Sequence, residues 1–98
     1  VAKETGILEA DLAAAMRKGV VPGSERANAL AERHRAGIDQ WFDTTYSKQV
    51  LIARGYVADP RFTAYYDKIE DGLAAWLKEI IDANAAAHGV DPAAAVWE

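Results

Sequence analysis

The chain has 98 residues, a length that predicts one domain with one modest core. Its net charge of −4 argues against duplex DNA binding by this chain alone, because DNA-binding surfaces are basic. It contains no cysteine, which excludes disulfides, thiolate metal sites and cysteine nucleophiles, and a cytoplasmic protein is expected. Much of the 51% hydrophobic fraction is alanine, so the three Trp, four Tyr and two Phe must supply much of the core volume.

Helical periodicity predicts a first helix over residues 3–18, which Gly19 and the Pro22-Gly23 pair end. Ser24 is a good N-cap for a second helix. Apolar positions then recur every three or four residues and predict one buried stripe, formed by Ala27, Leu30, Ala31, His34, Ile38, Trp41 and Phe42. We expect this helix to end at the irregular segment 43–45.

Three further helices are predicted in the second half. Thr45 is expected to cap the third, which runs to about Gly55 with Val50 and Leu51 as core anchors. Asp59-Pro60 predicts the start of the fourth, since Asp caps and Pro suits the first helical position. That helix carries Phe62, Tyr65, Tyr66 and Ile69. A break near 70–72 leads to the fifth, of which one side is formed by Leu73, Trp76, Leu77, Ile80, Ile81, Asn84 and His88.

A last short turn is predicted to start at Asp91-Pro92 and to end in Trp97. No strand pattern, internal repeat or linker interrupts the helical pattern, and no apolar run is long enough to span a bilayer. The fold class predicted from the sequence is therefore all-α, a single compact bundle of about five helices.

Aromatic side chains are the main candidates for a binding site. Trp41 and Phe42 lie beside an irregular segment, where ligands are commonly admitted, and aromatic faces bind flat heterocycles by stacking. The alternative is that both belong to the core. Tyr65 and Tyr66 are adjacent on a helix, so we expect one to pack and the other to look toward solvent or a pocket.

Residues for catalysis or metal binding are not evident. No Ser or Thr has a His and a carboxylate in a recognisable nucleophile arrangement. His34 and His88 are the only histidines and neither belongs to a metal-ligand cluster; His34 is more typical of a hydrogen-bonded core histidine. We therefore expect no enzyme activity, no metal and no cofactor.

Five phrases of the sequence resemble the TipAS family of antibiotic-recognition domains (thiostrepton-induced protein) in order and spacing. They are Ala31-Glu32-x-His34-Arg35, Trp41-Phe42, Tyr56-Val57-Ala58-Asp59-Pro60-Arg61-Phe62-Thr63-Ala64-x-Tyr66, Gly72-Leu73-Ala74-Ala75-x-Leu77 and Ile81-x-Ala83-Asn84-Ala85. The resemblance implies a globin-like helical arrangement without haem. It also implies a cleft that reversibly binds bulky hydrophobic or heteroaromatic molecules, thiopeptide antibiotics among them, as the effector-binding part of a MerR-type transcription regulator.

Two departures from the family pattern bear on the ligand. The family's founding member has a cysteine in the turn after the Trp-Phe pair and can capture a dehydroalanine-bearing antibiotic covalently; Thr44 occupies that place here, so reversible binding is expected. The family also carries an acidic residue, Met and His in the third helix, where this chain has Ser47, Lys48 and Gln49. If those positions touch the ligand, its identity has changed.

We therefore expect residues 1–98 to form one TipAS-like ligand-binding domain, truncated at its N-terminus because the family's domain extends upstream of Val1. DNA would be contacted only through an upstream domain, and no membrane is involved. The expected ligand-binding residues are His34, Ile38, Trp41, Phe42, Thr44, Tyr46, Tyr56, Phe62 and Tyr65. The alternatives are a stand-alone drug-sequestering resistance protein, a globin-like haem protein with His34 or His88 as iron ligand, and a protein-interaction module.

Overall fold

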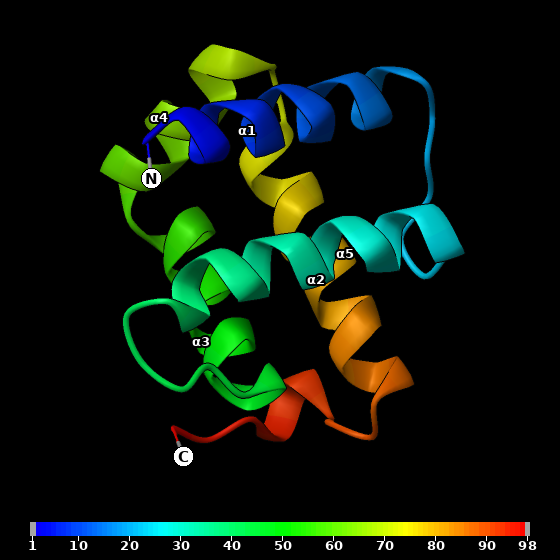
Figure 1. Cartoon of the computed structure of the whole chain (residues 1–98), viewed down its shortest axis with the longest axis vertical. Coiled ribbons are helices and arrows are strands. Elements are labelled where there is room, and N and C mark those ends of the chain that lie inside the picture. The colour runs from blue at the N-terminus through cyan, green and yellow to red at the C-terminus, as the bar shows by residue number, and fades with distance from the viewer. Residues whose placement is uncertain (1, 98) are drawn as a thin grey trace.

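A computed structural model describes the backbone of residues 2–97 and the side chains of residues 6–97. This part of the chain is all-helical, which confirms the predicted fold class (Figure 1). The elements are α1 (Ala2–Arg17), α2 (Glu25–Asp39), α3 (Tyr46–Ala58), α4 (Pro60–Ile69), α5 (Leu73–Ala87) and the short 3₁₀ helix η1 (Pro92–Ala94). They form a bundle of 30 × 26 × 24 Å.

Three helices begin where the sequence predicts, and each start is capped by a side chain. The side-chain oxygens of Ser24, Thr45 and Asp59 accept the backbone N–H groups of Ala27, Lys48 and Arg61. Such caps satisfy N–H groups that have no partner inside the helix. Between α4 and α5 the chain turns at Gly72, whose φ of 84° suits glycine alone and where an added Cβ would lie 3.1 Å from Met16 Cε.

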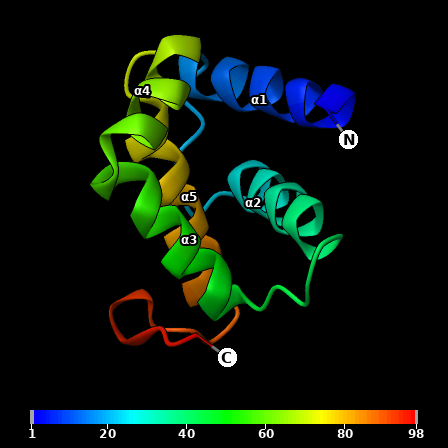
Figure 2. The ribbon, with the colours of Figure 1, turned by 90° about the vertical axis from the view of Figure 1, so that its left-hand side faces the viewer.

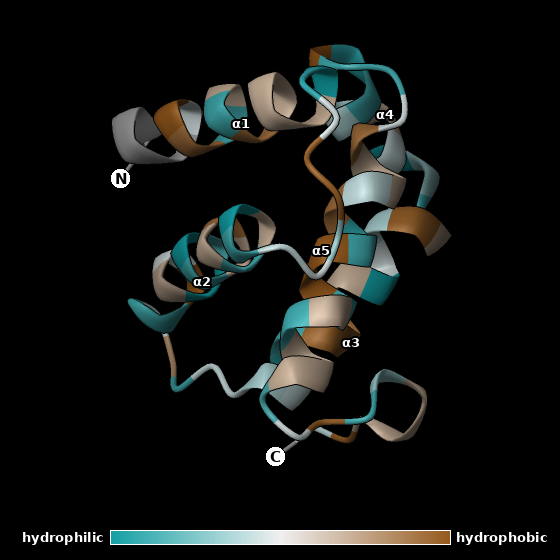
Figure 3. Ribbon diagram, turned by 90° about the vertical axis from the view of Figure 1, so that its right-hand side faces the viewer, coloured by the Kyte–Doolittle hydropathy of each residue, from teal (hydrophilic) through white to brown (hydrophobic). Residues whose placement is uncertain are grey.

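The core is built around α5, which contacts all four other α helices. Its inward face consists of Leu73, Leu77, Ile80 and Ile81, each fully buried. Burying a side chain of this size contributes about 1.5–3 kcal/mol. Figure 2 shows α5 alongside α3, with α2 beside them and α1 crossing near α4. In Figure 3, hydrophobic and hydrophilic segments alternate along α3 and α5, as expected for helices with one buried face.

The buried stripe of α2 is shorter than predicted. It contains Ala27, Leu30, Ala31 and His34, but the helix ends at Asp39 and the chain turns away from the core. The Asp39 carboxylate accepts the backbone N–H of Thr44 at 2.8 Å and closes this bend. As a result Ile38 is only half-buried, Trp41 is 80% exposed and Phe42 is 40% exposed.

Other boundaries differ by a few residues. Helix α3 continues three residues past Gly55, to Ala58, and the 3₁₀ helix covers only Pro92–Ala94 of the predicted last turn. Val50 is a core residue as predicted, whereas Leu51 is only half-buried. His88 follows the end of α5 and is exposed. No helix among the described residues has both the length and the hydropathy needed to cross a membrane.

Candidate functional site: an aromatic groove

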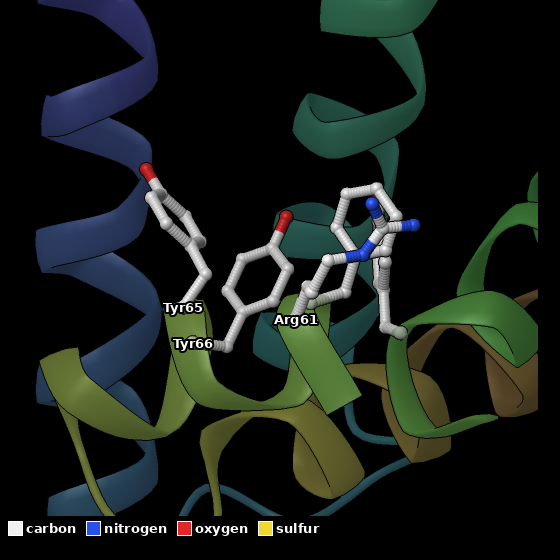
Figure 4. Close-up of a pocket in the computed structure, with 5 residues that line it drawn as sticks. Arg61, Tyr65 and Tyr66 are labelled. Carbon is white, nitrogen blue, oxygen red and sulfur yellow. The ribbon is translucent and has the colours of Figure 1, made fainter. Parts of the chain in front are cut away.

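An open groove of about 470 Å³ lies at the junction of α3 and α4 (Figure 4). Tyr56 comes from the last turn of α3, and the other lining residues come from α4: Arg61, Phe62, Tyr65 and Tyr66. Only Asp59 separates the two helices, because it caps α4 while Pro60 begins it. This abrupt restart brings the rings of α4 against the ring of Tyr56. The volume lies within the range of small-molecule sites.

The walls of the groove are aromatic rings in contact with one another. The ring centroid of Tyr56 lies 5.8 Å from that of Phe62 and 4.9 Å from that of Tyr66. Tyr65 and Tyr66 meet edge to face, with centroids 5.1 Å apart. Phe62 is 48% exposed and Tyr65 51% exposed, so a planar ligand can cover the exposed surface of both rings. As expected, one of the two adjacent tyrosines packs and the other is open: Tyr66 is half-buried against the core and Tyr65 is exposed, while both line the groove.

A buried polar chain lies behind Tyr56. His34 Nε2 is 3.1 Å from the Tyr56 hydroxyl, and His34 Nδ1 is 2.9 Å from the side-chain nitrogen of Gln49. The same Gln49 nitrogen donates to the carbonyl oxygen of Ala31 at 2.9 Å. Burial lowers the pKa of His34 to about 4, so its imidazole is neutral at neutral pH. His34 is thus the hydrogen-bonded core histidine that its position on the apolar stripe favours.

Burial, together with a nearby carboxylate, keeps the phenols of Tyr56 and Tyr66 protonated. Burial raises the pKa of Tyr56 and of Tyr66, and the carboxylate of Glu9 acts in the same direction on both. Tyr65 donates its hydroxyl hydrogen to Glu9 of α1 at 2.7 Å. The guanidinium of Arg61 pairs with Asp59, which raises the pKa of Arg61. At neutral pH the groove therefore presents hydroxyl groups and one cation.

Tyr46 lies in a second cluster that does not line the groove. Its ring is stacked on that of His88, with centroids 4.3 Å apart, and the guanidinium carbon of Arg35 lies 4.4 Å from its centroid. Glu32 accepts from both Arg35 and Asn84. These contacts connect α2, the start of α3 and the end of α5. They give Tyr46 a structural role at the opposite end of α3 from Tyr56.

Thr44 does not line the groove either. It is 2% exposed, its hydroxyl donates to the carbonyl oxygen of Phe42, and its own carbonyl oxygen accepts from Arg35. Phe42 packs against Trp97 with ring centroids 5.7 Å apart, and the ammonium of Lys48 lies over both rings. Two of the α3 residues that depart from the family pattern also lie inside the fold. Ser47 and Gln49 are buried and hydrogen-bonded.

The structure thus divides the nine predicted site residues into three groups. Tyr56, Phe62 and Tyr65 line the groove, and His34 supports Tyr56 from behind. The remaining five lie outside its lining: Ile38, Trp41, Phe42, Thr44 and Tyr46. The sequence prediction omitted Arg61 and Tyr66, although both belong to the motif 56–66 that includes three of the predicted residues.

Metal binding finds no support in the part of the chain that the structure describes, where no three His, Cys, Asp or Glu side chains are close enough to hold an ion. Both ring nitrogens of His34 already have partners, Tyr56 and Gln49. The Nδ1 atom of His88 lies 2.8 Å from the carbonyl oxygen of Asn84, and its ring is stacked on Tyr46. Neither histidine side chain faces the groove.

Comparison with known proteins identifies the family. The family model of the TipAS antibiotic-recognition domain matches residues 1–84. The HTH-type transcriptional activator TipA of Streptomyces coelicolor, like that of Streptomyces lividans, is 40% identical over 76 residues, which cover 76% of this chain and 30% of the relative. The HTH-type transcriptional regulator SkgA of Caulobacter vibrioides is 31% identical over 85 residues, which cover 85% of this chain and 33% of the relative.

The chain spans about a third of the length of the curated relatives it matches. No solved structure matches the chain. The family model covers all of α1 to α4 and most of α5, and the groove lies wholly within the matched residues. The chain therefore belongs to the TipAS antibiotic-recognition domain family.

Proposed function

We propose that residues 1–98 form the effector-binding domain of a MerR-type transcription regulator, and that the groove at the α3–α4 junction reversibly binds a bulky heteroaromatic antibiotic of the thiopeptide kind. The observation that carries the proposal is the cluster of four aromatic rings around a space of about 470 Å³. A space of this size takes one or two planar rings of such a ligand, and the rest would lie across the surface. DNA contacts belong to a separate domain, since this chain has a net charge of −4.

Ligand binding would be transmitted through α1. This helix is tied to the groove end of the bundle by two exposed contacts, the Tyr65–Glu9 hydrogen bond and the Arg17–Glu70 ion pair. Exposed ion pairs contribute little, commonly below about 1 kcal/mol, so these two contacts hold α1 only weakly against α4, while its buried residues Leu12, Ala13 and Ala15 hold it on the core. A ligand that covers Tyr65 and prefers one position of α1 would change the balance between two states, and an attached DNA-binding domain would respond to it.

Binding is expected to be noncovalent. The chain has no cysteine, and the hydroxyl of Thr44, at the position of the family's cysteine, donates to the carbonyl oxygen of Phe42 inside the turn. A threonine hydroxyl without a base to activate it does not add to dehydroalanine. Intact-mass spectrometry after incubation with thiostrepton should give the mass of the unmodified chain. An adduct would contradict reversible binding while leaving the groove in place.

A thermal-shift series tests the proposal. Thiopeptides at 100 times their Kd should add about 2.7 kcal/mol to the stability of the chain and raise its Tm by several degrees. Phe62→Ala removes a groove wall and should abolish most of this shift, whereas Trp41→Ala, at a residue 80% exposed and outside the lining, should preserve it. Loss of the shift in Trp41→Ala but not in Phe62→Ala would move the site away from the groove.

A further inference from the structure

The hydrogen bonds behind the groove have a fixed direction. The side-chain nitrogen of Gln49 lies 2.9 Å from the carbonyl oxygen of Ala31, which can only accept, so the amide must turn its NH₂ group toward this oxygen. The same nitrogen is 2.9 Å from His34 Nδ1, and its second hydrogen points there. Nδ1 is therefore the accepting nitrogen, and the neutral ring carries its hydrogen on Nε2.

This tautomer determines what Tyr56 can do. The Nε2–H group of His34 donates to the Tyr56 hydroxyl oxygen at 3.1 Å. The hydroxyl hydrogen of Tyr56 is therefore not donated to the histidine and is available to another acceptor. The ring centroids of Tyr56 and Tyr66 lie 4.9 Å apart. A hydrogen bond between the two hydroxyls would use one of their two hydrogens, so the pair retains at least one hydroxyl hydrogen. Figure 4 shows the Tyr66 hydroxyl directed away from its helix, into the space that the labelled side chains surround.

The other lining groups differ in what they offer a ligand. Tyr65 has already given its hydroxyl hydrogen to Glu9, and Phe62 has no polar atom. Arg61 supplies only N–H donors, part of which bond Asp59. Toward a ligand the Tyr65 hydroxyl could only accept, but it is already paired with Glu9. The charge of Arg61 is balanced by its ion pair with Asp59, and the negative charge of Glu9, which acts on Tyr56 and Tyr66, opposes the approach of an anion.

We propose that the groove selects a neutral, planar heteroaromatic group that accepts a hydrogen bond from the Tyr56–Tyr66 pair, through an unprotonated ring nitrogen or a ring carbonyl. This inference rests on the proposed function of the groove and adds the chemical class of the group that enters it. Stacking on Tyr56 and Phe62 supplies apolar contact of little directionality, and the hydroxyl hydrogen supplies orientation. A ring that only donates would leave this hydrogen without a partner.

Two ring systems of similar size separate donors from acceptors. Quinoline accepts through its ring nitrogen, which is unprotonated at pH 7.5, and indole only donates through its N–H. Each is titrated into the chain, and binding is followed by NMR shifts of the backbone amides of residues 56–66. A single neutral hydrogen bond predicts that quinoline binds about fivefold more tightly than indole.

The double variant Tyr56→Phe/Tyr66→Phe keeps both rings and removes both hydroxyls. It should bind the two probes equally, while Tyr46→Phe, at a tyrosine in the other cluster, should keep the preference for quinoline. A thermal melt of each variant verifies that it is folded. The titration of the unaltered chain decides the question on its own if the double variant does not fold.

The outcomes separate the two proposals. Equal binding of quinoline and indole by the unaltered chain, or a preference that survives in the folded double variant, would overturn the hydrogen-bond inference and leave the groove as a binding site. If neither quinoline nor indole shifts the amides of residues 56–66, the groove is not the binding site, and this inference falls with it.

Discussion

At the scale of single residues, His34 is the group that most clearly links sequence, stability and site. It is 7% exposed, both ring nitrogens have partners, and it holds a tyrosine of the groove. A sequence can indicate that a histidine on an apolar stripe is buried and hydrogen-bonded. It cannot name the partners, because Gln49 and Tyr56 come from the next helix and reach His34 only through the packing of α2 on α3.

The pKa of His34 predicts how stability depends on pH. The unfolded chain has the ordinary histidine pKa, near 6.5, and the folded chain a value of about 4, so the unfolded chain binds more protons between these values. The stabilising contribution is complete above pH 6.5 and is lost as the pH falls toward 4. Between pH 7 and pH 5 the free energy of unfolding should fall by about 2 kcal/mol. Urea unfolding at the two pH values measures it.

The variant His34→Gln supplies the control for this pH dependence. It lacks the titrating ring, so its stability, although lower, should change little between pH 7 and pH 5. The pKa of Glu32 is lowered below its ordinary value in the folded chain, so its protonation affects stability mainly at lower pH and adds little to the change between pH 7 and pH 5. Stability that is unchanged, or that rises, as the pH of the unaltered chain is lowered would contradict the buried neutral histidine.

Gln49 is predicted to matter for stability and not only for the direction of hydrogen bonds. Gln49→Leu has a similar volume but leaves His34 Nδ1 without a donor, and an unpaired buried polar group costs about 1–3 kcal/mol. The Ala31 carbonyl loses its side-chain donor but lies inside α2, where it keeps its helical partner. Gln40→Leu is the matched control, since Gln40 is exposed and bonds only the nearby carbonyl of Gly37. Denaturant unfolding should show a loss in the first variant and little change in the second; equal effects would contradict the assigned network.

At the scale of elements, helix starts could be predicted and some helix ends could not. Ser24, Thr45 and Asp59 are local signals, because each cap bonds an N–H group two or three residues further on. The end of α2 depends on the Asp39 carboxylate reaching the N–H of Thr44 across a bend. The periodic pattern continues through Trp41 and Phe42, so it predicted a longer helix and a site that included both residues.

The α3–α4 junction should control the shape of the groove. Asp59→Ala removes the side-chain acceptor of the Arg61 N–H and the ion pair with its guanidinium, so we expect a lower Tm and weaker ligand binding. Asp59→Asn keeps a capping oxygen and should recover most of both properties. Titration of the two variants with the same thiopeptide measures the effect, and unchanged affinity in Asp59→Ala would show that the junction does not shape the site.

At the scale of the whole molecule, α5 supplies the core and α4 supplies the walls of the groove. Leu77 is fully buried, and Leu77→Ala should cost about 2–5 kcal/mol, a large part of the stability of a 98-residue domain. None of the residues of α4 is fully buried, so substitutions at Phe62 should affect binding far more than folding. Thermal unfolding of Leu77→Ala and Phe62→Ala in parallel tests this division; comparable losses of Tm would contradict it.

The all-α architecture and the motif 56–66 follow from local patterns, and the structure and the family match confirm the fold class and the family. The groove itself arises from tertiary contacts. Tyr65 donates a hydrogen bond to Glu9, 56 residues earlier in the chain. The ring of Tyr46 stacks on His88, just after the end of α5. Separations of this kind leave no trace in helical periodicity, so the sequence could not show which of the predicted aromatic residues share a surface.

The most direct test of the account is hydrogen–deuterium exchange of the chain with and without a bound thiopeptide. If the groove is the site, slower exchange should be confined to residues 56–66 and the facing part of α1 around Glu9. Slower exchange around residues 41–48 and 88–97, where Trp41, Phe42 and Trp97 lie, with no change at 56–66, would contradict the central claim that the antibiotic binds at the α3–α4 junction.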